Sequence, residues 1–317
     1  MGLQPQKCIR GGRRGLAVNT SYVTPRPLDL FPGAALALGL RAESAATLTS
    51  PIIKVRRTSD NAQANIYADL SVPWADITLN SPIVVTSGSS SSVTLGDFCA
   101  GTNGAIVTWY DQSGLARHAT QGTTGAQPLL VQNGQLVTRN GRPALLFDGV
   151  DDFLGGSLIP SLVDVPTSVF MFFAPASTSV DHRALFYNNG AIPGIERLKV
   201  NIQGGLLAVG LRNVANTSWI AGRGTSGITA GNSYLMASEY DGTARNLFLD
   251  GVDNSSPTGT LGQVGGDSNT MRIGARSSSA DFFHGRLSEL IISADTPLPN
   301  RAAITAAQAR YFGITLP

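Results

Sequence analysis

The sequence predicts an all-β protein, and its composition, turn residues and strand spacing each support this fold class. The 317 residues include 36 Gly and 17 Pro but only four Glu and three Lys. Gly and Pro favour turns, whereas Glu and Lys usually cover the solvent-facing surfaces of helices. From residue 104 onward, short apolar runs alternate with turn residues, and almost no helical segment separates them. This spacing indicates a β-sandwich rather than a parallel α/β sheet.

The first hundred residues are less regular. Residues 1–33 contain four prolines and no hydrophobic periodicity, which predicts an extended arm. The alanine-rich residues 34–46 follow, bounded by prolines, and we expect them to form a helix. Residues 51–57 alternate apolar and basic side chains, and residues 83–86 form a short apolar run. Both segments are predicted strands, because alternation with a period of two is typical of a half-buried strand.

The remaining chain is predicted to consist of strands and one helix. Asp-Gly pairs after apolar runs, at residues 148–149 and 250–251, predict hairpin turns with positive φ. Asn300 is a good helix N-cap and Gly313 a good C-terminal stop, so a short helix is expected between them. The expected strands are residues 106–110, 129–131, 144–147, 168–173, 183–187, 198–202, 206–211, 233–240, 245–249, 271–273 and 283–292.

Charge is unevenly distributed along the chain. Residues 1–57 hold nine basic and two acidic residues, a net charge of +7, which leaves −5 for the remainder of the total of +2. The arm contains Arg10, Arg13 and Arg14, which we expect to anchor the chain to an acidic protein surface. A solvated tail is the alternative interpretation. Nucleic acid is not an expected partner.

Cysteine use and hydropathy indicate where the chain folds. Cys8 and Cys99 do not form a disulfide framework, so both are predicted to be free thiols. Residues 1–20 lack the apolar segment of a secretory signal, and no apolar run is long enough to span a membrane. We therefore expect synthesis in a reducing cytoplasm, without a signal peptide or membrane insertion.

The later part of the chain resembles a known superfamily. Its segments RPALLFDGVDDFL, YLMASEYDGTARNLFLDGV and MRIGARSSSADFFHGRLSELII occur in the order seen in laminin G-like and pentraxin-like sandwiches. The resemblance implies a concanavalin A-like jelly-roll β-sandwich over residues 34–317. Within it, residues 136–317 would form the laminin G-like core and residues 34–135 a front part.

The front part has a second resemblance. IIKVRRTSDNAQANI and FCAGTNGAIVTWYDQSGLARHATQ are similar to the opening of the catalytic domain of B-type α-L-arabinofuranosidases. The same pair of motifs recurs in bacteriophage structural and tail-associated proteins. The later segments that hold the catalytic carboxylates of those hydrolases have no counterpart in this sequence. The resemblance therefore implies the fold of these enzymes without their activity.

Paired carboxylates are the first chemistry that this fold could support. A glycosidase needs two carboxyl groups about 5–9.5 Å apart. The candidates are limited to Glu43, Glu196, Glu239, Glu289 and the pair Asp151 and Asp152. Glu289 alternates with leucines in the last strand, which predicts a structural role, and the two aspartates would point to opposite faces of a strand. We therefore predict no enzymatic activity.

Metal sites are not strongly indicated. His118, His182 and His284 are isolated from other ligands, so zinc is not expected, and His118 is predicted to be a hydrogen-bonded turn residue. The carboxylates of Asp148, Asp151 and Asp152 are ligands that calcium prefers. Calcium stays open beside the simpler interpretation as an Asp-Gly turn, and no other cofactor is expected.

Glycan binding is the expected function of the sandwich. Exposed aromatic and amide side chains stack on and hydrogen-bond to sugars, and Trp219, Tyr187 and Asn188 are the candidates. Trp74 and Trp109 are assigned to the core or an interface. We expect a homo-oligomeric virion protein of a tailed phage, a fibre, spike or decoration subunit. The arm would bind other virion proteins, and the sandwich a host surface glycan. A glycoside hydrolase acting on that polysaccharide is the alternative.

Overall fold

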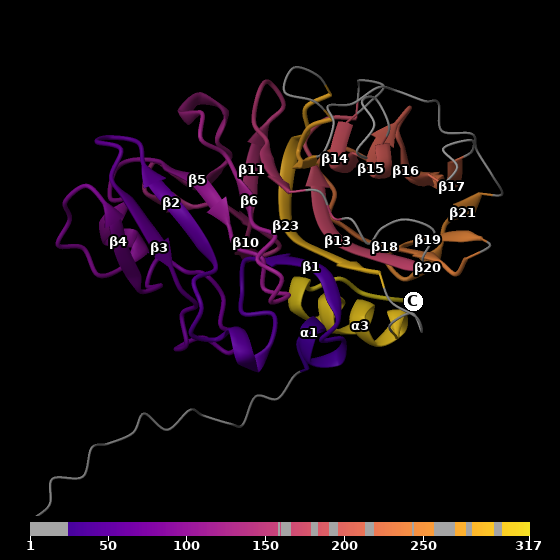
Figure 1. Cartoon of the computed structure of the whole chain (residues 1–317), viewed down its shortest axis with the longest axis horizontal. Coiled ribbons are helices and arrows are strands. Elements are labelled where there is room, and N and C mark those ends of the chain that lie inside the picture. The colour runs from indigo at the N-terminus through magenta and orange to yellow at the C-terminus, as the bar shows by residue number, and fades with distance from the viewer. Residues whose placement is uncertain are drawn as a thin grey trace, which may run out of the picture.

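The computed structural model describes most of the chain after residue 24, and nearly all of its regular structure is β (Figure 1). The all-β prediction is confirmed. Apart from a small hairpin of β9 (Thr138–Arg139) and β10 (Arg142–Pro143), the strands form one continuous hydrogen-bonded sheet. The described residues are 25–157, 159, 166–178, 183–189, 196–212, 219–242, 244–256, 270–276, 281–294 and 300–317.

Strand β5 (Gly104–Trp109) is the junction from which the two layers of the sandwich extend. Its first half pairs with β7 (Leu129–Gln132) and its second half with β6 (Ala119–Thr120). One layer, called the lower layer because its strands β13, β18, β19 and β20 lie below β14, β15 and β16 in Figure 1, continues from β7 through antiparallel neighbours. Their order is β11 (Leu145–Asp148), β23 (His284–Ser293), β13 (Thr167–Pro175), β18 (Tyr234–Tyr240), β19 (Arg245–Leu249) and β20 (Val252–Asp253).

The upper layer continues from β6 in the same antiparallel manner. Because both layers begin at β5, the front part and the core share one sheet. The order of the upper strands is β12 (Leu154–Ser157), β22 (Thr270–Ile273), β14 (Arg183–Asn189), β15 (Glu196–Gln203), β16 (Leu206–Arg212), β17 (Trp219–Gly227) and β21 (Ser255–Ser256). These bounds contain or overlap the strands expected from the sequence after residue 104.

The other edge of β5 carries the remaining front strands. β2 (Ile53–Arg57) pairs with β5, β3 (Gln63–Ile66) pairs with β2, and β4 (Ile83–Ser87) pairs with β3. The strands predicted over residues 51–57 and 83–86 are therefore confirmed. Short elements connect the front strands: η1 (Ala45–Thr47), α2 (Leu95–Phe98), η2 (Thr124–Ala126) and β8 (Gln135–Leu136).

The helix predicted over residues 34–46 is wrong. Its first half is β1 (Ala34–Gly39), which pairs with the C-terminal half of β23, beside β11 on the same edge. Leu36 and Leu38 pack in the core between the layers, whereas Ala37 faces the helices outside the lower layer. All six residues of β1 are buried, which explains why the strand is apolar on both faces. Tertiary burial has overridden the high helix propensity of Ala and Leu.

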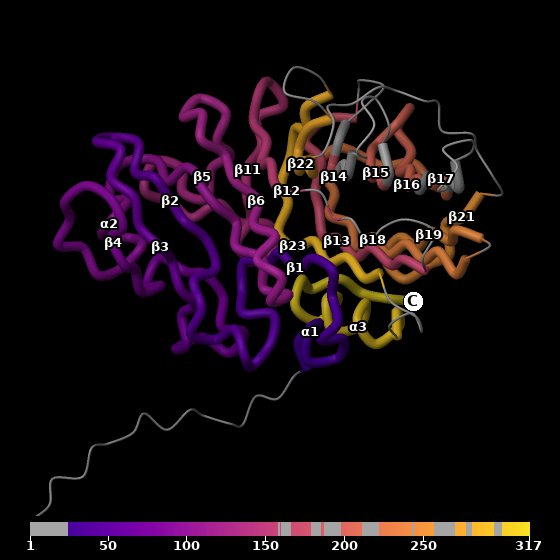
Figure 2. Tube along the Cα trace, in the orientation of Figure 1, coloured from indigo at the N-terminus to yellow at the C-terminus, as the bar shows by residue number. Residues whose placement is uncertain are grey.

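Two helices cover the outer face of the lower layer (Figure 2). The helix predicted at the C-terminus is confirmed as α3 (Arg301–Phe312), with Asn300 Oδ1 accepting from the Ala303 N–H at 3.1 Å and Gly313 at φ 65°. Helix α1 (Pro27–Leu30) packs beside it through Leu28. The packed body therefore begins before residue 33, and the prediction of an extended chain is wrong for residues 27–30. Residues 1–24 lie outside the described part.

The main core lies between the layers and continues into the front part. Trp109 is fully buried in it, as predicted. Cys99 is a buried free thiol, also as predicted, and burial raises its pKa to about 12, which disfavours the reactive thiolate. Cys8 lies outside the described residues. Within the described part of the chain, no helix has the length and apolar character needed to cross a membrane.

Candidate functional site

The WYDQSG segment, which begins at the last residue of β5, holds β1 in place through hydrogen bonds. Trp109 Nε1 donates to the carbonyl of Gly39 at 2.9 Å. Asp111 Oδ1 accepts from the Ala37 N–H at 3.0 Å, and the Gln112 N–H donates to the Ala37 carbonyl at 2.8 Å. These contacts provide hydrogen-bond partners for backbone N–H and C=O groups on the edge of β1 opposite β23.

The same arrangement continues at both ends of β1. The side chain of Gln112 accepts from the Glu43 N–H at 2.9 Å and donates to the Arg41 carbonyl at 2.9 Å. Arg117 Nη1 donates to the Ala35 carbonyl at 2.7 Å. The side chains of this segment thus form hydrogen bonds to the backbone of β1 that a neighbouring strand would otherwise form. The most distinctive sequence motif in the front part has a structural role.

His118 ends this loop in a fixed orientation. Its Nδ1 accepts from the Asp111 N–H at 3.1 Å, and its ring lies edge-on to that of Tyr110 with centroids 5.0 Å apart. The prediction of a hydrogen-bonded turn residue is confirmed. Because Nδ1 is an acceptor, the ring proton is on Nε2, which leaves an N–H donor at that position.

A groove of about 600 Å³ lies beside His118, where β6, β12 and β22 pair. Gly155 on β12 is opposite Thr120 on one side and Arg272 on the other, and Ser157 is opposite Thr270. Its volume is within the range of small-ligand sites. Further lining atoms come from Ala116, His118, Phe153, Gly156 and Met271.

Strand alternation explains which side chains face the groove. Leu154 and Met271 pack in the core, so their neighbours in sequence face away from it. Accordingly, the Arg272 guanidinium lies over the ring of Phe153, 4.9 Å from its centroid. Gly156 allows the His118 loop to approach β12, because a Cβ there would lie 2.7 Å from the His118 carbonyl oxygen.

The glycan-binding residues predicted from the sequence lie on the same layer. Tyr187 is opposite Arg272 in the register of β14 and β22, and Asn188 is opposite Met271. Trp219 begins β17, three strands from β14, or about 14 Å at the usual strand spacing. The side chains of Trp219, Tyr187 and Asn188 lie outside the described part, so these assignments stay predictions.

The Asp148 turn is stabilised by its own carboxylates. Asp148 Oδ1 accepts from the Val150 N–H at 2.8 Å, and Asp152 Oδ2 accepts from the Asp148 N–H at 3.0 Å. The ligand oxygens of Asp148, Asp151 and Asp152 lie within 4.8 Å of one another. Burial, and then the charge of Asp148, raise the pKa of Asp152 to about 7. The turn already uses the carboxylates of Asp148 and Asp152, and calcium stays open beside the interpretation as an Asp-Gly turn.

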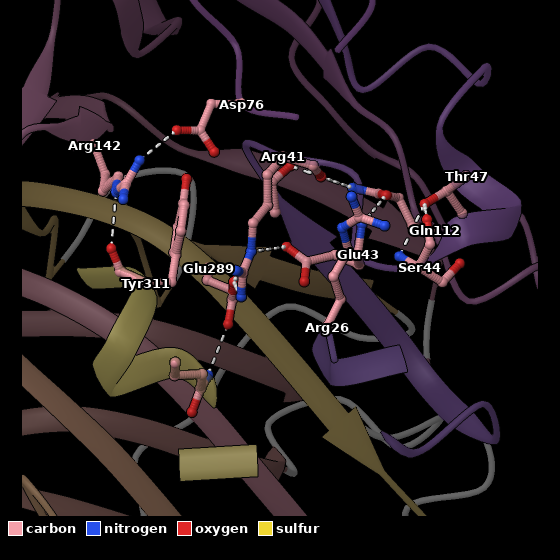
Figure 3. A network of polar contacts seen from close by, with 12 residues as sticks. Arg26, Arg41, Glu43, Ser44, Thr47, Asp76, Gln112, Arg142, Glu289 and Tyr311 are labelled. Atoms are coloured by element: carbon pink, nitrogen blue, oxygen red, sulfur yellow. Dashed lines mark hydrogen bonds and ion pairs between the residues drawn. The ribbon is translucent and has the colours of Figure 1, made fainter. Parts of the chain in front are cut away.

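The three glutamates whose side chains are described lie outside the groove. Glu43 and Glu289 are buried, at 0% and 1% exposure, on either side of Arg41 (Figure 3). Glu239 pairs with Arg301 at 3.1 Å. Glu196 begins β15, and its side chain lies outside the described part. The structural role predicted for Glu289 agrees with this burial. Arg10, Arg13, Arg14 and His182 also lie outside the described residues.

The groove was not identified from the sequence. Arg272 lies in a short strand, and the alternation of the sequence TMRI is the one local signal that could have shown its side chain facing away from the core. Phe153 follows the Asp-Gly turn and was not singled out from the sequence. Both residues line the groove only because β6, β12 and β22 pair with one another, and no local sequence pattern specifies that pairing.

Comparison with known proteins supports the fold assignment. Residues 157–299 match the family model described as the concanavalin A-like lectin/glucanases superfamily. No curated protein matches the chain. An arabinofuranosidase complexed with arabinofuranosyl-alpha-1,2-xylobiose has a similar structure, with a TM-score of 0.56 at 12% identity over 91% of this chain. A GH54 α-L-arabinofuranosidase soaked with a cyclic sulfate inhibitor gives a TM-score of 0.51 at 11% identity over 91% of this chain.

The present chain spans 65% of the length of these two enzymes. At such identities the likeness concerns the fold and not the activity. The two layers joined at β5 and these structural matches show that the chain has the fold of a concanavalin A-like jelly-roll β-sandwich, and its residues 157–299 match the superfamily model.

Proposed function

We propose that the protein is a carbohydrate-binding domain whose ligand occupies the groove between β6, β12 and β22. The observation that supports this proposal is the lining of the groove. It combines Phe153, the Arg272 guanidinium that lies over the Phe153 ring, and His118 with the hydroxyl-bearing residues Thr120 and Ser157. Planar groups beside a few hydrogen-bonding groups are suited to the faces and hydroxyls of a sugar.

The groove is better suited to binding than to hydrolysis. Glycoside hydrolysis needs a pair of carboxyl groups across the scissile bond. Among the described residues that line the groove, none is Asp or Glu. We therefore favour a binding protein over the arabinofuranosidase-like hydrolase, and the release of sugars from a bound polysaccharide would contradict this choice.

Filling the groove should weaken binding without unfolding the protein. A Cβ on Gly155 would make only ordinary contacts at 3.9 Å, and its backbone φ is not in the left-handed region. We expect Gly155→Leu to weaken binding to an array of bacterial surface polysaccharides at least tenfold, because the side chain would cover the groove floor. The melting temperature should stay within a few degrees of that of the wild type.

Gly125→Leu is the matched control. Gly125 is exposed in η2, a Cβ added to it would have no other atom within 4 Å, and it does not line the groove. This variant should bind the array as the wild type does. Equal binding by the Gly155 variant would place the ligand elsewhere and overturn the assignment of the groove.

We also propose that the protein is a homo-oligomeric structural component of a tailed-phage virion, anchored to other virion proteins by its arm. The support is the net charge of +7 over residues 1–57, the arginines at 10, 13 and 14, and the similarity of the front motifs to those of phage structural proteins. Like-signed charge on a terminal arm favours attachment to an acidic partner surface.

Removal of residues 1–24 tests the anchoring. This deletion leaves α1 in place, which packs beside α3 and belongs to the body. We expect the shortened chain to keep its melting temperature and glycan binding but to be absent from purified particles, measured by immunoblotting. Incorporation at the level of the full chain would contradict a role of the arm in anchoring.

A further inference from the structure

We infer that the groove selects acidic saccharides, with the carboxylate of a uronic-acid-type sugar bound by Arg272. This inference rests on the proposed glycan-binding function and specifies its ligand class. It depends on the balance of hydrogen-bond donors and acceptors around the groove, which differs from that expected for a neutral sugar.

Arg272 is the central donor. Its guanidinium lies over the ring of Phe153, with 4.9 Å between its central carbon and the ring centroid, and this cation–π contact favours a position beside the groove. A guanidinium has five N–H donors in a fork that matches the two oxygens of a carboxylate. Arg272 can therefore keep partners within the protein and still donate to a ligand.

His118 is a second hydrogen-bond donor among the residues that line the groove. Its Nδ1 is occupied by the Asp111 N–H, so the ring presents Nε2–H, and the contact with Tyr110 restricts ring rotation. His118 follows the loop that Asp111 and Gln112 tie to β1, so its backbone is fixed as well. The histidine is thus held in its donor form by a backbone hydrogen bond.

The described lining has no anionic group to compete with an acidic ligand. Its other polar side chains are the hydroxyls of Thr120, Ser157 and Thr270, which can donate or accept. A neutral sugar offers donors and acceptors in similar numbers, and it would be better matched by carboxylates or amides. A groove with a guanidinium, an imidazole N–H and hydroxyls is better matched by a ligand rich in acceptors.

The absence of a side chain at Gly155 provides room for the sugar ring. Gly155 lies between Thr120 and Arg272 in the register, so a ring placed over it would be within reach of both Arg272 and the His118 loop. The carboxylate would then lie against Arg272 and the ring hydroxyls against Thr120 and Ser157.

Matched pairs of trisaccharides test this inference. The intact protein is titrated calorimetrically with galacturonate, glucuronate and mannuronate trisaccharides and with the neutral galactose, glucose and mannose counterparts, which differ only at C6. We expect at least one acidic member to bind ten times more tightly than its neutral partner, and this preference to shrink as salt is added. A sulfated galactose trisaccharide distinguishes carboxylate recognition from attraction to any negative charge.

Two arginine variants complete the experiment. Arg272→Lys keeps the charge but loses the fork, so it should lose most of the preference, and Arg272→Gln should lose all of it. Arg310→Gln is the control, because Arg310 is exposed in the last turn of α3. Acidic and neutral members that bind equally would overturn this inference but keep the glycan-binding proposal. Absence of binding to both sets, and to the polysaccharide array, would overturn both.

Discussion

Glu289→Gln is expected to lower the free energy of unfolding by about 3–5 kcal/mol, because it removes the carboxylate to which a buried arginine donates two hydrogen bonds. Arg41 is 1% exposed, and its Nη2 lies 2.9 Å from Glu289 Oε2. The other oxygen of Glu289 accepts from Gln308 Nε2 at 2.8 Å, which ties β23 to α3. Denaturant unfolding followed by tryptophan fluorescence measures the loss. A change below about 1 kcal/mol would show that solvent replaces the carboxylate and that the pair contributes little.

The neighbouring glutamate should behave differently. Glu43 Oε1 lies 3.6 Å from Arg41 Nε, and Gly39 permits this position, because a Cβ there would overlap the Glu43 carboxyl. Burial, and then the proximity of Glu289, raise the pKa of Glu43 well above 4.5, although Arg41 opposes the shift. The shift favours the protonated form of Glu43, and Glu289 is the carboxylate that Arg41 is hydrogen-bonded to.

Glu43→Gln is therefore expected to cost less than about 1 kcal/mol at neutral pH, since glutamine resembles the protonated acid. A raised pKa in the folded state means that the proton stabilises the wild type below pH 4.5, and that this stability is lost as pH rises toward the folded-state pKa. Glu43→Gln should remove that component. Unfolding free energies of the wild type and variant at pH 5, 7 and 9 test this, and a Glu43→Gln loss equal to that of Glu289→Gln would contradict it.

Local patterns were sufficient for most of the fold. The strands after residue 104 and helix α3 follow from alternation, turn residues and caps, which act within a few residues. Residues 34–39 were predicted wrongly, because their alternation of Ala and Leu also fits a helix, and the choice depends on the edge of β23. That edge is formed about 250 residues later in the chain.

The groove illustrates the same limit for function. Thr120, Gly155 and Arg272 are neighbours across three strands, although more than 30 residues separate any two of them. The sequence indicated candidate sugar contacts from residue type alone, and of these Tyr187 and Asn188 lie on the strand next to the groove. Long-range pairing, not residue type, determines which polar side chains converge.

The WYDQSG motif gives the second large stability prediction, because its aspartate accepts four hydrogen bonds. Asp111 accepts from the N–H groups of Ala37, Ser113 and Arg117 and from the Ser113 hydroxyl, at 2.7–3.0 Å. We expect Asp111→Ala to lower the free energy of unfolding by about 2–4 kcal/mol, since the Ala37 donor would be left buried without an acceptor. Hydrogen exchange at Ala37 should accelerate, and groove binding should weaken, because the same loop positions His118.

Asp97→Ala is the control for this prediction. Asp97 is exposed and accepts from the Thr94 hydroxyl at 2.7 Å, so its removal should cost less than about 1 kcal/mol and leave glycan binding unchanged. If Asp111→Ala kept the stability and binding of the wild type, the motif would not be what holds β1. If it lost stability but bound as before, the groove would not depend on the loop. The expected combination, lower stability with weaker binding, would connect a motif with a structural role to the function of the groove.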